Sequence, residues 1–429
     1  MPDSADAYSF QELQALQERG VQLHAAEQLW IRRDVPLDQI ASGSELFPGA
    51  RLQGSATRIH PNAKVGLRGP VHVEDSQVGS DSQVGTLGPV SLVRTTVGPR
   101  SVLGSGAAED AVFLGKETSV NDFTTGLGFR VRKGSLYEED SSSAQHTDTK
   151  MTILMPWSTL GSNINFCDAL LSGGRGPQLG EFSEVGSGTI HFNFTTRGDK
   201  ATGSCFGDVI RGVLLEQERI FIGGNCSLMG PMSADFGAII GAGSRLGGVL
   251  GTGLHLKGLE ANGLPGGLPA RMSLRKAKQV LGSQLRLLKE LLLLEVWYRK
   301  IRVQVLARSE EQTQAYDQGA RMVCLNRRER LDKLQDWLLK ACGDSAELRS
   351  LSEQAAHKLK RLPEAEQALE WELPETVLHE LGQCAGTGST TTYTEIVRAV
   401  AHAPGQHLKS WLQSLNGRLA PYFSEADLH

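Results

Sequence analysis

An aliphatic residue recurs every six positions over most of residues 46–258, and a glycine often follows it. The last block keeps this step over five positions: Ile222, Leu228, Ala234, Ile240 and Leu246. A period of six fits neither the 3.6-residue period of a helix nor the alternation of a half-buried strand. It is the period of the hexapeptide repeat, in which six residues form one short strand and one corner of a parallel β-helix. The pattern therefore predicts a β-solenoid over residues 46–263.

Two segments outside this pattern have other expected structures. Residues 1–45 contain the apolar spacing of an amphipathic helix from Ser9 to Arg33, followed by a linker. We expect this helix to cover the open end of the solenoid, as a solenoid requires. Residues 121–150 lack the repeat and are polar, so we interpret them as a loop inserted between coils, where binding residues are common.

The character of the chain changes at residue 270, where glycine becomes scarce and helix-forming runs begin. The spacing predicts an all-α domain over residues 270–429. One apolar stripe combines the residues at i, i+4, i+7 and i+11: Leu281, Leu285, Leu288 and Leu292. The stripe faces either the core of the same chain or a neighbouring chain.

Composition limits the classes of function. The net charge of −4 leaves no basic footprint for nucleic acid. No apolar stretch is long enough to span a membrane, and the first residues lack a signal core, so we expect a cytoplasmic protein. The six cysteines are scattered without a CxxC pair, which indicates reduced thiols and no metal framework.

The candidate chemistry lies in two polar segments of the solenoid, GSNINF at 161–166 and GTIHFNF at 188–194, the second of which runs on to Lys200. Asn193, Arg197, Asp199 and Lys200 fall within eight residues. Arginine and lysine bind anions, and asparagine pairs with amide and hydroxyl groups. The segment therefore suits a sugar phosphate or a sugar nucleotide.

The order of these segments resembles the left-handed β-helical acetyltransferase domain of the bifunctional bacterial enzyme that makes UDP-N-acetylglucosamine. The similarity covers about Gly161 to Leu246. It implies a left-handed parallel β-helix, a homotrimer and an acyl-CoA co-substrate, with no tightly bound cofactor. It also implies two sets of contact residues. The sugar-nucleotide set is Asn165, Asn193, Phe194 and Lys200, and the acyl-CoA set is Gly241 and Ala242.

The chain departs from that family in two places. The family's histidine base would lie within residues 150–157, which contain no histidine. Acyl transfer to an amine needs a base, for which imidazole is suited near neutral pH. His191 is the replacement that we expect, and His146 is the alternative. The second departure is in residues 1–45, which contain no nucleotide loop for a uridylyltransferase.

Two functions follow from the sequence. The first is a hexapeptide-type acyltransferase that uses acyl-CoA to modify an amino sugar phosphate or a sugar nucleotide. The second is a non-catalytic protein that binds a UDP-N-acetylhexosamine or serves as an assembly scaffold, which the added helical domain favours. Nucleotidyl transfer has no visible machinery in the chain.

Overall fold

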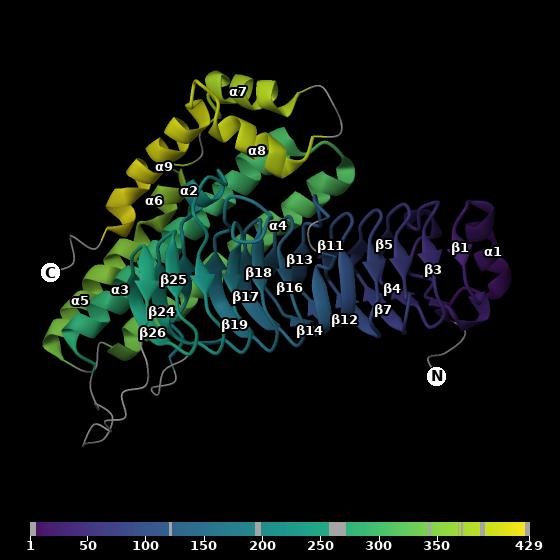
Figure 1. Ribbon diagram of the computed structural model, residues 1–429, viewed down its shortest axis with the longest axis horizontal. Helices are drawn as coiled ribbons and strands as arrows, with labels where there is room; N and C mark the ends of the chain where they lie inside the picture. Colours follow the sequence, from purple (N-terminus) through teal and green to yellow (C-terminus); the bar gives the residue numbers. More distant parts are fainter. Residues whose placement is uncertain are drawn as a thin grey trace, which may run out of the picture.

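The computed structural model describes residues 6–119, 122–193, 199–256, 272–341, 345–367, 369, 372–386 and 391–424. A parallel β-solenoid of about 12 turns forms the N-terminal part, and a group of helices lies along one side of its C-terminal half (Figure 1). Both predicted parts are confirmed. The left-handed winding stays a prediction.

Helix α1 (Phe10–Glu18) covers the first coil. Ser9 is its N-cap and forms a capping box with Glu12, which satisfies backbone donors at the helix start. Leu13 and Leu16 on its inner side are buried. The helix therefore seals the open end of the solenoid, as expected.

The solenoid begins earlier than residue 46. Strand β1 (Gln22–Leu23) follows α1 almost directly, and the single-turn helices η2 (Ala26–Gln28) and η3 (Leu37–Gln39) lie within the first coils. The prediction of helix and linker through residue 45 is wrong beyond Glu18. The inward residues of these coils are not spaced by six, so the repeat does not reveal them. They are Val21, Ile31, Val35 and Ile40.

Three columns of parallel strands form the wall of the solenoid. We call the first column the open face; the strands that belong to it alone are β2 (Trp30–Ile31), β4 (Arg51–Gln53), β7 (Val71–Glu74), β10 (Val90–Val93) and β21 (Ile190–Phe192). We call the second column the docking face; its own strands are β5 (Arg58–Ile59), β8 (Gln77–Val78), β11 (Thr96–Val97), β13 (Ala111–Phe113), β15 (Ser135–Tyr137) and β22 (Ser204–Phe206).

The third face completes the triangle. Its strands are β1, β3 (Glu45–Leu46), β6 (Lys64–Val65), β9 (Gln83–Val84), β16 (Ser142–Ser143), β18 (Ser158–Leu160), β20 (Ser183–Val185), β23 (Phe221–Ile222), β25 (Ala238–Ile240) and β27 (Gly253–His255). Longer strands bend at a corner and serve two faces: β12 (Val102–Glu109), β14 (Thr125–Val131), β17 (Asp148–Leu154), β19 (Asn165–Leu171), β24 (Ser227–Ala234) and β26 (Arg245–Leu250).

The described residues 122–150 do not form an inserted loop, so the prediction of a loop over residues 121–150 is wrong. Strands β14, β15, β16 and the start of β17 place most of this segment in regular coils. The reason lies in the inward column of the third face, where Thr125 and Ser143 take positions that aliphatic residues hold in other coils. Their neighbours in that column include Leu103 and Leu160. Buried hydroxyl residues continue the coil but erase its hydrophobic signal.

The helical part follows residue 272. Its elements are α3 (Leu274–Val296), the π-helical segment η4 (Trp297–Leu306), α4 (Glu310–Ala341), α5 (Ala346–Lys360), α6 (Leu362–Gln367), α7 (Glu375–Ala385), α8 (Tyr393–Ala401) and α9 (His407–Phe423). The leucine stripe of α3 is buried within the same chain, which decides between the two expected arrangements. No helix among the described residues is long and apolar enough to cross a membrane.

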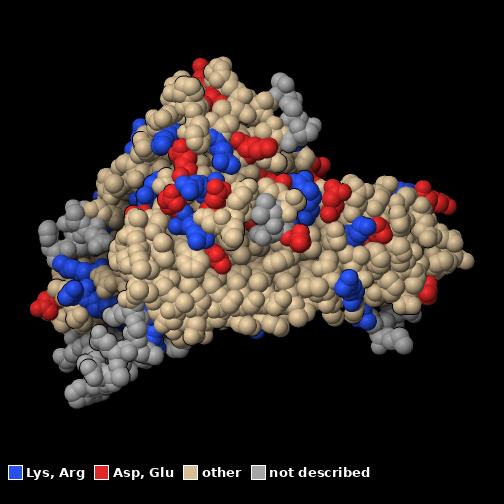
Figure 2. All heavy atoms as spheres, in the orientation of Figure 1, with Lys and Arg blue, Asp and Glu red and all other residues tan. Residues whose placement is uncertain are grey.

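Helices α3 and α4 pack on the docking face. Leu136, Ile153 and Leu170 point outward from the solenoid there and belong to one hydrophobic core with the helices. Helix α4 lies along several coils: Glu311 near its start accepts hydrogen bonds from Ser80, and Asn326 further along donates to the Gly134 carbonyl. In the view of Figure 2, charged side chains gather mainly on the helices and where these meet the solenoid.

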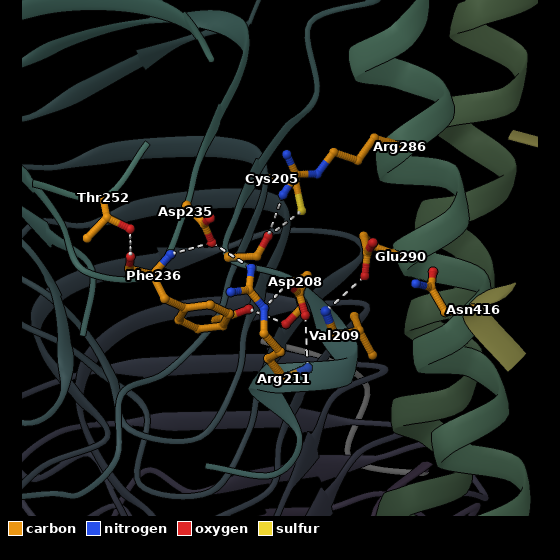
Figure 3. Close-up of polar contacts among 12 residues, drawn as sticks. Cys205, Asp208, Val209, Arg211, Asp235, Phe236, Thr252, Arg286, Glu290 and Asn416 are labelled. Atoms are coloured by element: carbon orange, nitrogen blue, oxygen red, sulfur yellow. Dashed lines mark hydrogen bonds and ion pairs between the residues drawn. The ribbon is translucent and has the colours of Figure 1, made fainter. Parts of the chain in front are cut away.

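A second junction holds a short excursion of the solenoid (Figure 3). Helix α2 (Val209–Gly212) begins at the N-cap Asp208, and the backbone N–H of Val209 donates to the carboxylate of Glu290 on α3 at 2.9 Å. Burial raises the pKa of Glu290. The excursion therefore links the solenoid to helix α3.

The junction between the solenoid and the helices, which we call the seam, also encloses the fully buried cation of Arg302. The guanidinium of Arg302 donates to Glu139 at 2.7 Å and to Glu138 at 3.1 Å. It lies 3.7 Å from the ring centroid of Tyr393, and the Tyr298 hydroxyl donates to Glu138 at 2.6 Å. This cluster joins η4 and α8 to one corner of the solenoid.

Candidate functional site

The open face presents two columns of polar side chains at its middle coils. Arg130, Asp148 and Asn165 are register partners on β14, β17 and β19. Two residues further along the same strands, Lys150 pairs with Cys167. Because side chains alternate along a strand, both columns point outward. We call this group, together with Arg132, the polar ladder.

Short contacts order the centre of the polar ladder. The Nε of Arg132 donates to Asp148 at 2.7 Å, and the Cys167 thiol donates to the Asn165 amide oxygen at 3.3 Å. Burial raises the pKa of Cys167 to about 12, so the thiol remains protonated at neutral pH. Cys167 is therefore a hydrogen-bond donor that orients Asn165, and not a nucleophile.

The polar ladder carries excess positive charge. Arg132 is paired with Asp148. Within the described part of the chain, Arg130 and Lys150 have no carboxylate at ion-pair distance. Three cations and one carboxylate leave a surplus of two positive charges. Such a surplus on an exposed surface attracts an anion.

His146 lies at the corner that leads into this group, two residues before Asp148. It is exposed and adopts a left-handed backbone conformation with φ of 54°. Its imidazole packs over Gly128, where an added Cβ would lie 2.5 Å from Nδ1. Glycine at position 128 therefore makes room for the ring beside the polar ladder.

His191 lies inside the solenoid. Its Nδ1 is 2.6 Å from the Cys167 carbonyl, and its Nε2 is 2.7 Å from the Ser204 hydroxyl. A carbonyl only accepts, so Nδ1 carries the proton. Burial lowers the pKa of His191, so the ring is neutral and Nε2 accepts from Ser204. Both nitrogens are satisfied within the fold. The catalytic role of His191 stays a prediction, and this geometry gives the ring a structural role.

Asn193 lies at the edge between the open and docking faces. Its amide donates to Asp168 at 2.7 Å, and Arg330 of α4 donates to the other oxygen of Asp168, also at 2.7 Å. The asparagine thus contributes to the attachment of α4. Asn165 and Asn193, predicted as one contact set, are thus separated: Asn165 lies on the open face and Asn193 at the corner.

The remaining predicted residues are dispersed or outside the description. Phe194 and Arg197 lie outside the described residues, and Lys200 is exposed. Gly241 and Ala242 lie at a corner three coils beyond Asn165, which corresponds to about 14 Å at the usual strand spacing. Their roles stay predictions.

Sequence reasoning missed the charged members of the polar ladder. A signal was present in the triplets Arg130-Val131-Arg132 and Asp148-Thr149-Lys150, in which charged residues flank a buried one. This is the alternation of a half-buried strand. Their assignment to an ejected loop concealed it.

Among the residues that the structure describes, no group of three or more histidine, cysteine, aspartate or glutamate side chains is placed to hold a metal ion. Neither the protein-family models nor the curated proteins contain a match to this chain.

Proposed function

We propose that the polar ladder binds a sugar nucleotide of the UDP-N-acetylhexosamine type. The observation that carries this proposal is a pair of cations, Arg130 and Lys150, that have no carboxylate partner among the described residues and lie near the exposed amide of Asn165. A diphosphate carries about two negative charges, which matches the surplus of the ladder. The Asn165 amide can pair with an N-acetyl or hydroxyl group.

Apolar side chains extend the same surface by one coil. Ile190 is the register partner of Asn165 and is 42% exposed, and Phe192 on the same strand is 39% exposed. An exposed aromatic ring beside hydrogen-bonding groups suits the flat face of a sugar or base. With Phe192 against the sugar face, charge, amide and ring follow the order of diphosphate, N-acetyl group and sugar ring.

Calorimetric titration with UDP-N-acetylglucosamine tests this proposal. Lys150→Ala and Arg130→Ala should each weaken binding by about tenfold, which corresponds to roughly 1.4 kcal/mol for one charge-assisted contact. Arg68→Ala is the matched control, because Arg68 is also exposed and without a described ion-pair partner but lies on a distant turn.

Two results would count against the polar ladder. One is the absence of saturable heat at millimolar ligand. The other is a loss of affinity in Lys200→Ala with none in Lys150→Ala, which would move the site to the segment that the sequence indicates.

The exposed position of His146 favours one further function at the same place, acyl transfer from acyl-CoA. An amine of the bound sugar would attack the thioester carbon, the C–S bond would break, and His146 would take the amine proton while the CoA thiolate leaves. With acetyl-CoA and glucosamine 1-phosphate as probes, His146→Ala should abolish thiol release and keep binding. Unchanged thiol release in this variant, or no thiol release from the wild type, would count against acyl transfer. Binding would then be the only function proposed for the polar ladder.

A further inference from the structure

A groove of about 980 Å³ lies on the open face near the N-terminal end. Its floor contains Trp30, Arg51 and His72, which are register partners on three successive strands. Tyr8 and Pro70 contribute to its walls. The size is in the range of small-molecule sites.

The groove combines a flat ring with a free cation. Arg51 is exposed, and in the described part of the chain no side chain or carbonyl is placed to accept from its guanidinium. Its register partner Trp30 is half-buried, one strand spacing of about 4.8 Å away. The lining also contains the polar residues Ser9, Glu27, Gln28 and His72. Glu27 is the carboxylate among them, and His72 has Glu74 at 3.6 Å and Ser91 at 3.4 Å. Arg51 is thus the cation that remains available to a ligand.

We propose that this groove binds a nucleoside monophosphate, with the base on the indole of Trp30 and the phosphate on Arg51. Arginine binds phosphate oxygens in a bidentate manner, and a Trp ring stacks on any base. Four coils separate Arg51 from Arg130, or about 19 Å at the usual strand spacing. The groove is therefore a second site, and the proposal does not depend on the function of the polar ladder.

Calorimetry with uridine monophosphate tests the groove in an Arg130→Ala background, in which binding at the polar ladder is weakened about tenfold. Arg51→Ala should weaken binding by about tenfold or more. Trp30→Leu should weaken the binding of the nucleotide but leave the weaker binding of inorganic phosphate unchanged. A thermal melt verifies that this variant is folded. Lys150→Ala, in the polar ladder, should have no effect on this titration.

Three outcomes would overturn the proposal. They are no saturable heat at millimolar nucleotide, equal affinity in Arg51→Ala, and glucose 1-phosphate binding as tightly as the nucleotide. The last would show that the base makes no contact with Trp30.

Discussion

The open face and the docking face belong to one solenoid and differ in their outward residues. On the docking face, Leu136 and Leu170 point outward and are covered by helices. On the open face, Arg130 and Asn165 point outward and remain exposed. The inward residues of both faces are similarly buried. The repeat builds the coil, and the alternate positions decide what each face contacts.

The largest expected effect concerns the cation that closes the docking face. Arg302→Met would leave Glu138 and Glu139 in the seam without their cation, which typically costs about 3–5 kcal/mol for a buried pair. Denaturant unfolding followed by circular dichroism measures the loss. Arg299→Met is the control, because Arg299 belongs to the same π-helical segment and its side chain is 54% exposed. Equal losses of unfolding free energy in both variants would show that solvent reaches the Arg302 cluster.

A matched pair of aliphatic truncations compares the two faces directly. Leu136 on the docking face is 0% exposed, whereas Ile190 on the open face is 42% exposed. Leu136→Ala should lower the free energy of unfolding by about 2–5 kcal/mol, and Ile190→Ala by less than about 1 kcal/mol. A large loss of unfolding free energy in Ile190→Ala would mean that a partner covers the open face in solution. If that partner is a second copy of the chain, the stability would depend on protein concentration.

The docking face should also be sensitive to pH. Glu117 accepts hydrogen bonds from the backbone N–H groups of Tyr393 and Thr394, at the start of α8. Burial, together with nearby Glu139, raises the pKa of Glu117 from 4.5 to about 7. The folded protein therefore holds a proton that the unfolded chain has released, so stability falls as pH rises from about 4.5 to about 7.

Glu117→Gln tests this dependence, because the amide keeps an acceptor for α8 and does not titrate. The loss of stability across this pH range, expected to be on the order of 2 kcal/mol for Glu117, should become smaller in the variant. It should not vanish, because burial also raises the pKa of Glu138 to about 7. An unchanged slope would assign the whole dependence to Glu138 or to other groups.

The sequence predicts the inward half of the fold well. Aliphatic residues such as Leu228 and Leu246 repeat in step with the six-residue period and reveal the coils. The prediction fails where Thr125 and Ser143 take the same inward positions, because a hydrophobic pattern does not register a buried hydroxyl. It also fails before residue 46, where the coils have no six-residue spacing.

The contacts of the outward-pointing side chains are harder to predict from the sequence, for a different reason. Arg302 and Glu138 meet across more than 160 residues of chain, and no local pattern reports such a pair. The candidate site was predicted only in part. Asn165 lies on the open face, but Asn193 contacts Asp168 at the corner, because it lies three residues beyond Ile190, the register partner of Asn165. The charged alternation around Val131 and Thr149 was readable and names the polar ladder more directly than the resemblance does.

The smallest expected effect is a difference in salt dependence between ligand binding on the open face and stability at the docking face. Charges on the open face are in contact with water, so raising the ionic strength from about 0.05 M to about 0.5 M should weaken UDP-N-acetylglucosamine binding roughly three- to tenfold. The Arg302 cluster is shielded from solvent, so the unfolding midpoint should change little over the same range. Calorimetry and thermal melts in the same buffers give both numbers. Binding that ignores salt would mean that the ligand rests on apolar contacts such as Phe192, and the cations of the polar ladder would then lose their assigned role.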